Sequence, residues 1–516
     1  MRRVFLSSSS STTAVFSSLG THNSRRCHST ERLSELLQFA VSKKVFESNE
    51  LEAAPVAMFY DLDVYDGLLR ECKEAFGGNF RHYVAAKANP LPSMLLRAVT
   101  EFGFGIECAS LGELLLATRE MKTQDVVFDS PAKTRKELRY VLENDIRCHL
   151  DNFDEYDRAK DMLKGKTTTH RKLGFRVNPS NVVANAKAIA ALSVSTPDSK
   201  FGVDLAIHED EVFRRYCESP FLDSIHVHVG SGFSSSASPE EQLGAGVRKA
   251  LDLALAVNRQ VPGRIRFIDI GGGLPARYDD SADDDVSDVS FWTYANHLRT
   301  RCPELFDSSQ FTVLTEFGQS LNAKAGFLAS RVEFVKKEET RSNNLAIIHF
   351  GADLCLRQAY ANDDHPRRFA AFDSKGHIKA SATDKFWTVG GPLCFQGDIL
   401  GRDLSLPQDL AEDDIIVMKD AGANTLSLFS RHCSRLAPPV YGLRVSRGTN
   451  QLSLLKPRES IDGLATFWTG HTASHRQAFL NQHRNKSMEK NNPDDNEFVG
   501  LDAYDAEETM KLATRL

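Results

Sequence analysis

A lysine follows a short apolar run in the stretch Tyr83-Val84-Ala85-Ala86-Lys87-Ala88-Asn89-Pro90. The run predicts a strand that ends at Lys87, because the Asn-Pro pair directly after it is a turn signal. At the rim of a sheet the amine would be partly desolvated. Desolvation lowers the pKa of an ammonium group and makes the amine a nucleophile toward a carbonyl. Most lysines at strand ends are solvated surface charges, so Lys87 alone does not decide between these interpretations.

Two histidines stand two residues apart in His226-Val227-His228-Val229-Gly230-Ser231-Gly232, so they share one face of a predicted strand. A metal site would need a third ligand, and no histidine-rich segment accompanies them, so no metal site is predicted. A histidine at a strand end can instead stack on an aromatic cofactor. Gly-Ser-Gly offers backbone N–H groups and a hydroxyl to an anion. A buried structural histidine remains the alternative for His226.

Three glycines, Gly271, Gly272 and Gly273, directly follow the apolar residues 267–270. Glycines let backbone amides approach a phosphate without side chains in the way, and the spacing is neither a Rossmann nor a P-loop pattern. Further on, Glu316 closes an apolar run in Thr315-Glu316-Phe317-Gly318-Gln319. Beside a pyridine nitrogen such a carboxylate would keep that nitrogen protonated, whereas alone it would be a solvated acid.

From about residue 55 the chain alternates strand-like and helix-like segments. Such repeats predict parallel strands, most simply an eight-stranded (β/α)8 barrel over residues 55–320, with its chemistry at the strand ends. Later strand-like segments lack long helices, which predicts a C-terminal, mostly-β domain over residues 321–470, joined by residues 31–54. Residues 471–516 are polar and predict a tail. The predicted strands are 57–60, 83–87, 104–109, 126–128, 147–150, 172–177, 224–229, 266–270, 313–316, 332–336, 345–350, 386–389 and 415–419, and the predicted helices include 64–76, 92–101, 112–120 and 134–143.

The composition of the 516-residue chain excludes several classes of protein. Its 41% apolar and 26% charged residues are typical of a globular protein. The net charge of -6 gives no basic surface for nucleic acid, and no apolar run is long enough for a membrane span. The nine cysteines are scattered without a Cys-x-x-Cys pair, which argues against a disulfide framework and for a reducing compartment.

The first 30 residues differ from the rest of the chain. They hold four arginines and many serines, and no acidic residue precedes Glu31. This composition is typical of an organellar transit peptide. Mitochondrial import is the favoured prediction, plastid import is second, and an N-terminal tail on a cytoplasmic protein is the remaining interpretation.

The order Lys87, His228, triple glycine and Glu316 resembles the pyridoxal-phosphate-dependent decarboxylases of basic amino acids, which have an alanine-racemase-like fold. These include ornithine, arginine and diaminopimelate decarboxylases. The similarity extends from about residue 55 to 470, which is most of the chain. It implies pyridoxal 5'-phosphate as the cofactor and decarboxylation of an amino acid as the activity.

The resemblance also implies roles for single residues. Lys87 would form the Schiff base with the cofactor. Cys394, in Gly391-Pro392-Leu393-Cys394-Phe395-Gln396-Gly397-Asp398, would protonate the product from a loop that reaches into the partner subunit, so a homodimer with shared active sites is implied. Taken on its spacing alone, Cys394 would be one more buried thiol. The implied cofactor contacts are Arg176 near the phenolic oxygen, His228 on the ring, Ser231, Gly271, Gly272 and Gly273 around the phosphate, Glu316 at the ring nitrogen, and Asn424 where relatives have a tyrosine that lines the phosphate.

The substrate follows from a comparison with the diaminopimelate branch. Gln319 stands where that branch carries an arginine that helps to hold a substrate carboxylate, and Phe395 replaces a glutamate that meets the distal amine. Arg357 is retained and resembles that branch's arginine for the distal carboxylate, and Asp398 is the second implied substrate contact. A bidentate arginine suits a carboxylate, so a diamino acid with a distal carboxylate, such as diaminopimelate, is favoured.

Three alternatives remain. An ornithine- or arginine-type decarboxylase would keep the chemistry and change the substrate. A racemase is disfavoured by Glu316, because racemases on this fold place an arginine at the ring nitrogen. A catalytically silent, decarboxylase-like regulator is compatible with the changes at Gln319, Phe395 and Asn424 but not favoured by the retention of Lys87 and Cys394.

Overall fold

The computed structural model divides the chain into two compact units, residues 1–458 and 459–516. The second unit contains helix α12 (Ile461–Thr469). Among the helices described, none combines the length and the apolar character needed to cross a membrane. Residues 1–27 of the predicted transit peptide and the tail from residue 471 lie outside the described residues, whereas Thr30 already begins helix α1 (Thr30–Ser42). The structure describes residues 28–48, 50, 53–120, 122–165, 172–180, 195–231, 238–276, 278, 290–337, 342–360, 367–379, 383–446 and 449–470.

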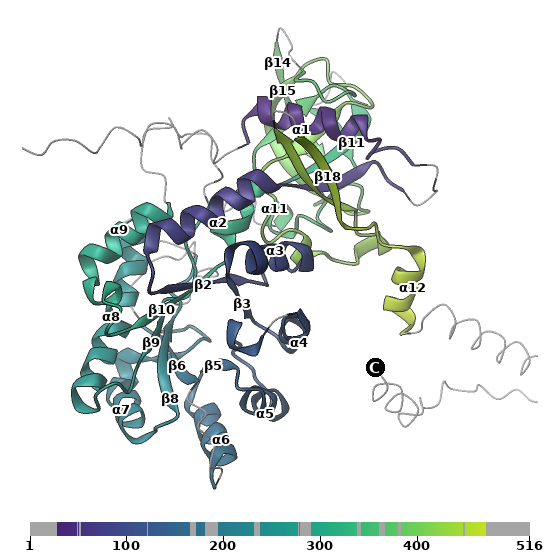
Figure 1. Cartoon of the computed structure of the whole chain (residues 1–516). Coiled ribbons are helices and arrows are strands. Elements are labelled where there is room, and N and C mark those ends of the chain that lie inside the picture. The colour runs from purple at the N-terminus through teal and green to yellow at the C-terminus, as the bar shows by residue number, and fades with distance from the viewer. Residues whose placement is uncertain are drawn as a thin grey trace, which may run out of the picture. The chain divides into compact units, whose positions relative to one another are not determined.

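Eight parallel strands close into a barrel, which confirms the predicted fold (Figure 1). Closure comes from the pairing of β10 with β2 on one side and of β5 with β6 on the other. A short ninth strand, β7 (Val203–Asp204), extends the sheet beside β6. The barrel strands are β2 (Phe80–Ala85), β3 (Gly105–Cys108), β4 (Val126–Phe128), β5 (Arg147–Leu150), β6 (Leu173–Asn178), β8 (Leu222–Val227), β9 (Phe267–Asp269) and β10 (Thr312–Phe317).

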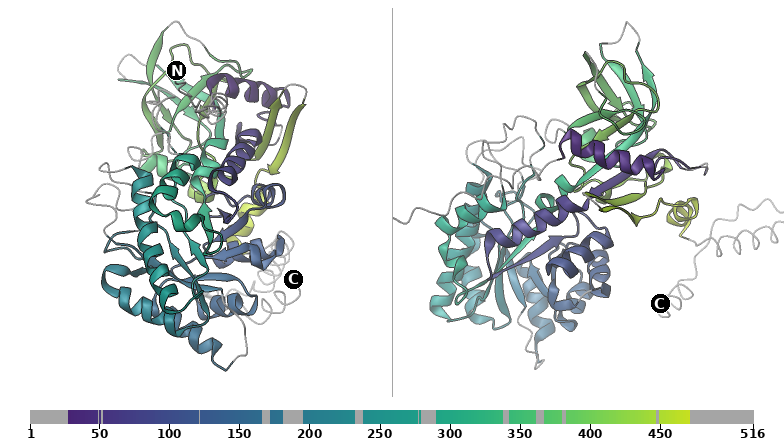
Figure 2. Two further views of the ribbon diagram at one scale, coloured as in Figure 1. Left: turned by 60° about the vertical axis from the view of Figure 1, so that its left-hand side comes forward. Right: turned by 45° about the horizontal axis from the view of Figure 1, so that its top comes forward.

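Helices follow the strands and cover the outside of the barrel (Figures 1 and 2). Their starts are set by local capping. Thr134 and Ser238 each form a capping box with a glutamate three residues later, at the beginning of α5 and α8. The helices are α2 (Leu62–Phe76), α3 (Pro92–Phe102), α4 (Leu111–Glu120), α5 (Arg135–Glu143), α6 (Phe153–Leu163), α7 (Leu205–Glu218), α8 (Pro239–Gln260) and α9 (Phe291–Arg301), with short 3-10 turns at Thr123–Asp125 and Pro303–Phe306.

The second sheet forms the predicted mostly-β domain, and all of its strands except β1 follow the barrel in the chain. Its main path runs β15-β14-β12-β11-β1-β17-β18, with β16 paired to β11 and β13 to β16. The later short helices are α10 (Gln319–Asn322) and α11 (Leu356–Tyr360), with 3-10 turns at Ala323–Ala325, Leu426–Leu428 and His432–Ser434. The strands are β1 (Val56–Asp61), β11 (Gly326–Lys336), β12 (Asn344–Ile348), β13 (Phe369–Phe372), β14 (Asp384–Gly390), β15 (Ile399–Pro407), β16 (Ile415–Met418), β17 (Val440–Ser446) and β18 (Thr449–Lys456).

The predicted start of the barrel at residue 55 is wrong, because strand β1 (Val56–Asp61) belongs to the second sheet. β1 pairs antiparallel with β11 and parallel with β17. Both of its faces are buried: Met58 and Tyr60 belong to the main core, whereas Ala57 and Phe59 pack in a separate cluster with helix α1 (Thr30–Ser42). A strand buried on both faces has the same continuous apolar sequence as a barrel strand, so the pattern alone could not separate the two.

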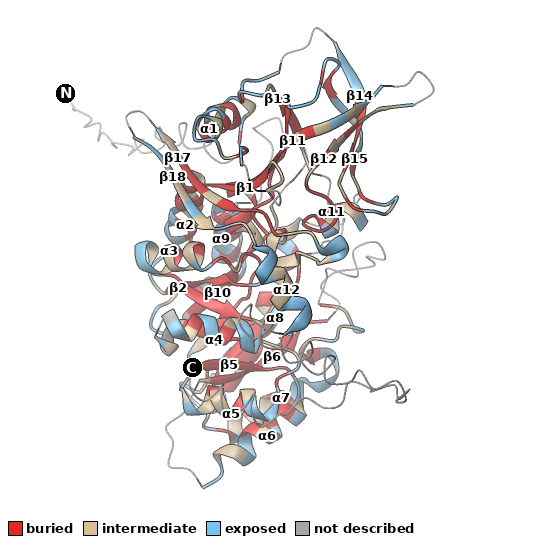
Figure 3. Cartoon of the chain, turned by 90° about the vertical axis from the view of Figure 1, so that its right-hand side faces the viewer, coloured by how far each residue is buried: buried red, intermediate tan, exposed pale blue. Residues whose placement is uncertain are grey.

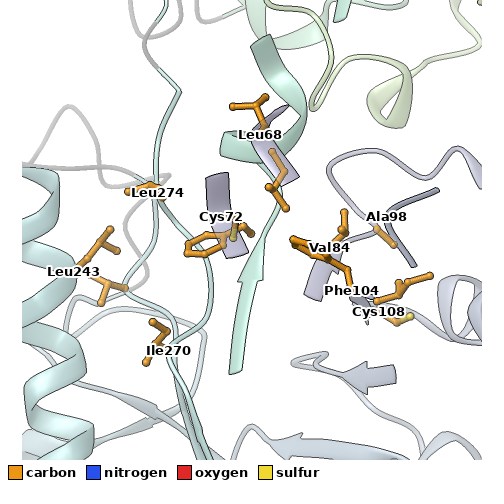
Figure 4. Packing of buried hydrophobic residues seen from close by; sticks show 14 of the residues in the cluster. Leu68, Cys72, Val84, Ala98, Phe104, Cys108, Leu243, Ile270 and Leu274 are labelled. Carbon is orange, nitrogen blue, oxygen red and sulfur yellow. The ribbon is translucent and has the colours of Figure 1, made fainter. Parts of the chain in front are cut away.

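The core lies between the barrel strands and their helices, where the burial colouring of Figure 3 is predominantly red. Figure 4 shows part of this cluster, in which Val84 of β2, Phe104 and Cys108 are fully or almost fully buried. The apolar packing fixes β3, which carries Glu107, and β2, whose end leads into the turn that holds Lys87.

The loop after β16 contacts three other segments: strand β1, helix α10 after the last barrel strand, and the turn after β2. The Tyr60 hydroxyl donates to the carbonyl of Gly422 at 2.8 Å. A Cβ at Gly422 would lie 2.0 Å from the carbonyl oxygen of Asn322, so only glycine fits there. In the next turn of this loop, the backbone N–H of Asn424 donates to the carbonyl of Ala88 at 2.9 Å, which places Asn424 beside the residue after Lys87.

Candidate active site

Lys87 lies in the turn after β2, two residues beyond the end of the strand at Ala85, and not at the strand end itself as predicted. Its amine donates a hydrogen bond to the carboxylate of Glu107 on the neighbouring strand β3. The Glu107 side chain is completely buried, whereas 48% of the Lys87 side chain is exposed. The reactive amine is therefore held at its base by a buried carboxylate and remains accessible from one side.

The electrostatics of Lys87 differ from the sequence-based expectation of a lowered pKa. Loss of hydration does lower the pKa of the amine, but the carboxylates of Glu107 and Glu316 outweigh it and the net pKa is raised. Burial also raises the pKa of Glu107, although Lys87 opposes that shift. Glu107 is therefore the group that can accept the proton which Lys87 must lose before it attacks a carbonyl.

Glu316, the predicted partner of the ring nitrogen, is buried on β10. Burial raises its pKa well above that of an ordinary carboxyl, and Asp269 on β9 raises it further. Its Oε1 atom is buried and has no hydrogen-bond partner among the residues that the structure describes. An unpaired buried carboxyl oxygen is costly unless a polar group meets it, so this atom fits the nitrogen of a pyridine ring.

His226 is fully buried next to Glu316, which agrees with the alternative of a buried structural histidine. Its Nε2 lies 3.5 Å from a Glu316 oxygen and its Nδ1 lies 3.4 Å from an oxygen of Asp129. Its ring stacks on that of His149 at a centroid distance of 4.5 Å. Asp129 and His149 were not singled out from the sequence, because each follows an apolar run whose pattern indicates only a strand.

Arg176 on β6 lies 3.3 Å from Asp129 and stacks on the ring of Phe201 at 4.4 Å. The contact with Phe201 covers one face of the guanidinium. Burial alone would raise the pKa of Asp129, but His226 and Arg176 bring it below its ordinary value, so Asp129 stays ionised.

The donor atoms in this region are close enough to resemble a metal site. One oxygen of Asp129 and one nitrogen each of His149 and His226 lie within 4.8 Å of one another. Arg176 shares the same carboxylate, and its charge would repel a cation at this position. Pairing between side chains therefore explains the cluster better than a metal ion does.

His228 and the glycine loop meet at the predicted phosphate position. The backbone N–H of Gly272 donates to Nδ1 of His228 at 3.1 Å. A Cβ at Gly272 would lie 2.3 Å from the Glu316 carbonyl, and one at Gly273 would lie 2.3 Å from the Gly230 carbonyl. Gly271 has a φ of 63°, where side chains are strained. The loop is thus close-packed backbone with no room for side chains, and the Gly271 N–H already donates to Asp269 at 2.9 Å.

Burial lowers the pKa of His228 to about 3, and the charges of Arg176 and Lys87 contribute to this shift. The ring is therefore neutral, which suits stacking on an aromatic cofactor. Ser231 is half-buried three residues further along the chain, and residues 232–237 after it lie outside the described part.

The remaining predicted residues come from the β domain. Asp398 is buried, and its carboxylate accepts from the backbone N–H groups of Ala352 and Leu393, both at 2.7 Å. It therefore fixes the cysteine loop, and its contact with substrate stays a prediction. Cys394 is exposed and not a buried thiol. Among the described residues no hydrogen bond or ion pair joins Cys394 to Lys87, and the role of Cys394 as a proton donor stays a prediction.

Comparison with known proteins agrees with this site. A family model described as "Pyridoxal-dependent decarboxylase, pyridoxal binding domain" matches residues 67–323. The chain is 27% identical over 408 residues to the diaminopimelate decarboxylase of Campylobacter jejuni, covering 78% of this chain and 93% of the relative. It is 28% identical over 375 residues to that of Archaeoglobus fulgidus, covering 71% and 82%, and 29% identical over 360 residues to that of Pseudomonas aeruginosa, covering 68% and 78%.

Solved structures support the fold. The crystal structure of diaminopimelate decarboxylase from Helicobacter pylori complexed with L-lysine has a TM-score of 0.68 at 23% identity, and covers 83% of this chain and 98% of that chain. Lysine decarboxylase from Selenomonas ruminantium has a TM-score of 0.58 at 21% identity, and covers 75% and 91%. The site residues fit pyridoxal 5'-phosphate on two observations of the structure itself: the unpaired buried oxygen of Glu316 and the close-packed glycine loop. Because the matched region is the barrel that holds them, the chain belongs to the pyridoxal-phosphate-dependent amino acid decarboxylases.

Proposed function

We propose that this decarboxylase acts on a diamino acid that carries a second, distal carboxylate, and that diaminopimelate is the substrate. The observation that carries the proposal is Arg357 on α11. It is half-buried, and no ion pair or hydrogen bond joins it to any other described residue. Burial lowers the pKa of its guanidinium, which means that the charged form is disfavoured there. A substrate carboxylate would relieve that cost, and ornithine and arginine have none at their distal end.

The relatives support the same substrate. Those reported above at 27–29% identity are diaminopimelate decarboxylases. One solved relative holds L-lysine, which is what remains of diaminopimelate after it loses one molecule of carbon dioxide.

Each residue of the site would have a separate role in such a reaction. Bound pyridoxal phosphate supplies an electron sink for the electron pair that carbon dioxide leaves behind. Lys87 would hold the cofactor through its amine, with Glu107 placed to take the proton of that amine, and the close-packed Gly271–Gly273 loop would lie against the phosphate. Glu316 would place its unpaired Oε1 against the ring nitrogen of the cofactor. This arrangement favours withdrawal of electrons into the ring and disfavours a racemase, in which the ring nitrogen faces an arginine.

A homodimer with shared active sites is part of the proposal. It is supported by the exposed position of Cys394, which has no described hydrogen bond or ion pair with Lys87 in its own chain. Mixing Lys87→Ala and Cys394→Ala subunits tests this arrangement. Random dimers with shared sites should regain up to about one quarter of the wild-type activity, because half are mixed and each mixed dimer has one intact site of two. No recovery, in a mixture shown by light scattering to have exchanged subunits, would refute shared sites.

Mitochondrial import is the proposed destination, supported by the arginine- and serine-rich, acid-free residues 1–30. Residues 1–30 fused to a fluorescent protein should direct it to mitochondria. Plastid fluorescence would support the second destination, and diffuse fluorescence would refute both.

The activity test is carbon dioxide release with added pyridoxal phosphate from meso-diaminopimelate, lysine, ornithine and arginine, with Lys87→Ala as the control. Release from diaminopimelate with lysine as the product, absent in the variant, is expected. Release from ornithine or arginine alone would replace the substrate and keep the chemistry. No release from any of the four by a protein that binds the cofactor would point to a regulator.

A further inference from the structure

We propose that Arg367 and Arg357 form a paired-guanidinium site for the distal carboxylate of the substrate, with Arg367 held in place by Tyr278 and Gln319. This inference rests on the proposed function and extends it, because it names the groups that would select the substrate. It starts from a contact between the barrel and the β domain.

Arg367 lies flat against Tyr278. Its guanidinium carbon is 3.6 Å from the centre of the tyrosine ring, a close cation–π contact. The Tyr278 hydroxyl in turn accepts a hydrogen bond from the side-chain amide of Gln319 at 2.5 Å. Tyr278 is 8% exposed, so both of its ends are used and the ring is fixed.

Tyr278 links this arginine to the segment of the chain that carries the reactive lysine. Its ring belongs to a small buried cluster with Ala88, Ala323 and Ala423. Ala88 directly follows Lys87, and the neighbouring N–H of Asn424 donates to the Ala88 carbonyl. Gln319 stands three residues after Glu316. Arg367 is thus linked, through one ring, to the segments that carry Lys87 and the partner of the ring nitrogen.

Neither arginine has an anionic partner among the described residues. The Nη1 atom of Arg367 is buried without a hydrogen-bond partner. The next residue, Arg368, differs in this respect, because its guanidinium forms an ion pair with the carboxylate of Asp420 at 2.9 Å. Arg367 is close enough to Arg357 for its charge to disfavour the charged form of that residue. Two desolvated like charges without an anion are costly, and an oxyanion bound between them would remove the cost.

The paired arginines also explain a departure in the sequence. Gln319 stands where the diaminopimelate branch has an arginine that helps to hold a substrate carboxylate. Here the side chain of Gln319 donates a hydrogen bond to Tyr278, and the guanidinium of Arg367 lies over the ring of Tyr278. The positive charge missing from position 319 is therefore supplied by a residue of the β domain.

The cofactor phosphate is the other oxyanion that two guanidiniums could bind. The predicted phosphate position is the glycine loop of the barrel, whereas both arginines belong to the β domain. We therefore assign the pair to the substrate carboxylate, and the two sources give different results in the experiment below.

The test compares Arg367→Gln and Arg367→Lys with wild type, using Arg402→Gln as a matched control that removes one exposed arginine from strand β15. Two quantities are measured: kcat/KM for meso-diaminopimelate and for lysine, and the cofactor dissociation constant by fluorescence titration. Arg367→Gln should lower kcat/KM for diaminopimelate about 10- to 100-fold, the worth of one charge-assisted hydrogen-bond pair. It should leave kcat/KM for lysine and the cofactor affinity unchanged. Arg367→Lys should recover only part, because it cannot bind bidentately.

The outcomes separate the possibilities. Weaker cofactor binding with equal losses on both substrates would assign Arg367 to the phosphate and overturn the carboxylate assignment. Kinetics and cofactor affinity like those of Arg402→Gln would overturn the site altogether. Wild-type enzyme that releases carbon dioxide from lysine or ornithine but not from diaminopimelate would refute the proposed function itself.

Discussion

The Glu316 carboxylate lies 3.5 Å from Nε2 of His226, whose Nδ1 lies 3.4 Å from Asp129. One buried ring thus bridges two acids, one facing the cofactor position and the other paired with Arg176. Burial keeps the pKa of His226 well below its usual value, so the neutral ring can donate one N–H to only one of the two acids. A change of the His226 side chain would therefore alter the surroundings of the Glu316 carboxyl.

Replacing His226 by phenylalanine should keep the stacking on His149 and remove the bridge. Without a donor beside it, ionised Glu316 is less stabilised, so its pKa rises further and the acidic limb of the kcat–pH profile should move to higher pH. The profile of His226→Gln, which retains one N–H donor, should lie between those of wild type and His226→Phe. Profiles that coincide for all three proteins would show that the bridge has no influence on Glu316.

Glu107→Gln should make Lys87 easier to deprotonate. The charge of Glu107 raises the pKa of Lys87, so removing it lowers that pKa and increases the fraction of neutral amine at pH 7. The rate at which apoenzyme captures pyridoxal phosphate, followed by absorbance, should reach its midpoint at a lower pH than in wild type. A midpoint at the same or a higher pH would contradict the assigned ion pair.

Gly272→Ala should weaken cofactor binding at least about tenfold, because the added methyl group would lie 2.3 Å from the backbone carbonyl of Glu316 and this contact cannot be relieved by a side-chain rotation. Gly67→Ala in helix α2 is the matched control, since nothing lies within 4 Å of its added Cβ. Titration of both apoenzymes with the cofactor measures the effect. Equal affinity in the two variants would show that the loop can move to accept a side chain.

Asp66→Asn should destabilise the enzyme at pH 7 by about 1–3 kcal/mol, the cost of losing charged hydrogen bonds. Asp66 on α2 accepts from Arg97 on α3 and from Arg444 on β17, so it joins barrel helices to the β domain. Burial alone would raise the pKa of Asp66, but the two arginines lower it.

A depressed carboxyl pKa stabilises the fold above the unfolded pKa, and this stability is lost as the pH falls through the folded value. The difference between wild type and Asp66→Asn in urea unfolding should therefore be full at pH 7 and shrink below about pH 4. A difference that stays constant into acid would contradict the ionic origin.

The sequence located the site residues that stand just beyond strands, such as Lys87 and Gly271, because turn and glycine signals mark them. It missed Glu107 and His149, which lie within apolar strands and acquire their role from partners on other strands of the barrel. The sequence also predicted a lowered pKa for Lys87, whereas its pKa is raised. A local pattern indicates burial but does not show the carboxylate of Glu107 on the neighbouring strand. Tyr278 and Arg367 meet only after the barrel and the β domain have both folded.

The most direct test of the account is the ratio of kcat/KM for meso-diaminopimelate to that for lysine with the wild-type holoenzyme. These two amino acids differ by one distal carboxylate, so the ratio isolates what that group contributes. A preference for diaminopimelate of about 100-fold or more is expected if Arg357 and its neighbour bind the carboxylate. Equal values, or a preference for lysine, would contradict the proposed substrate.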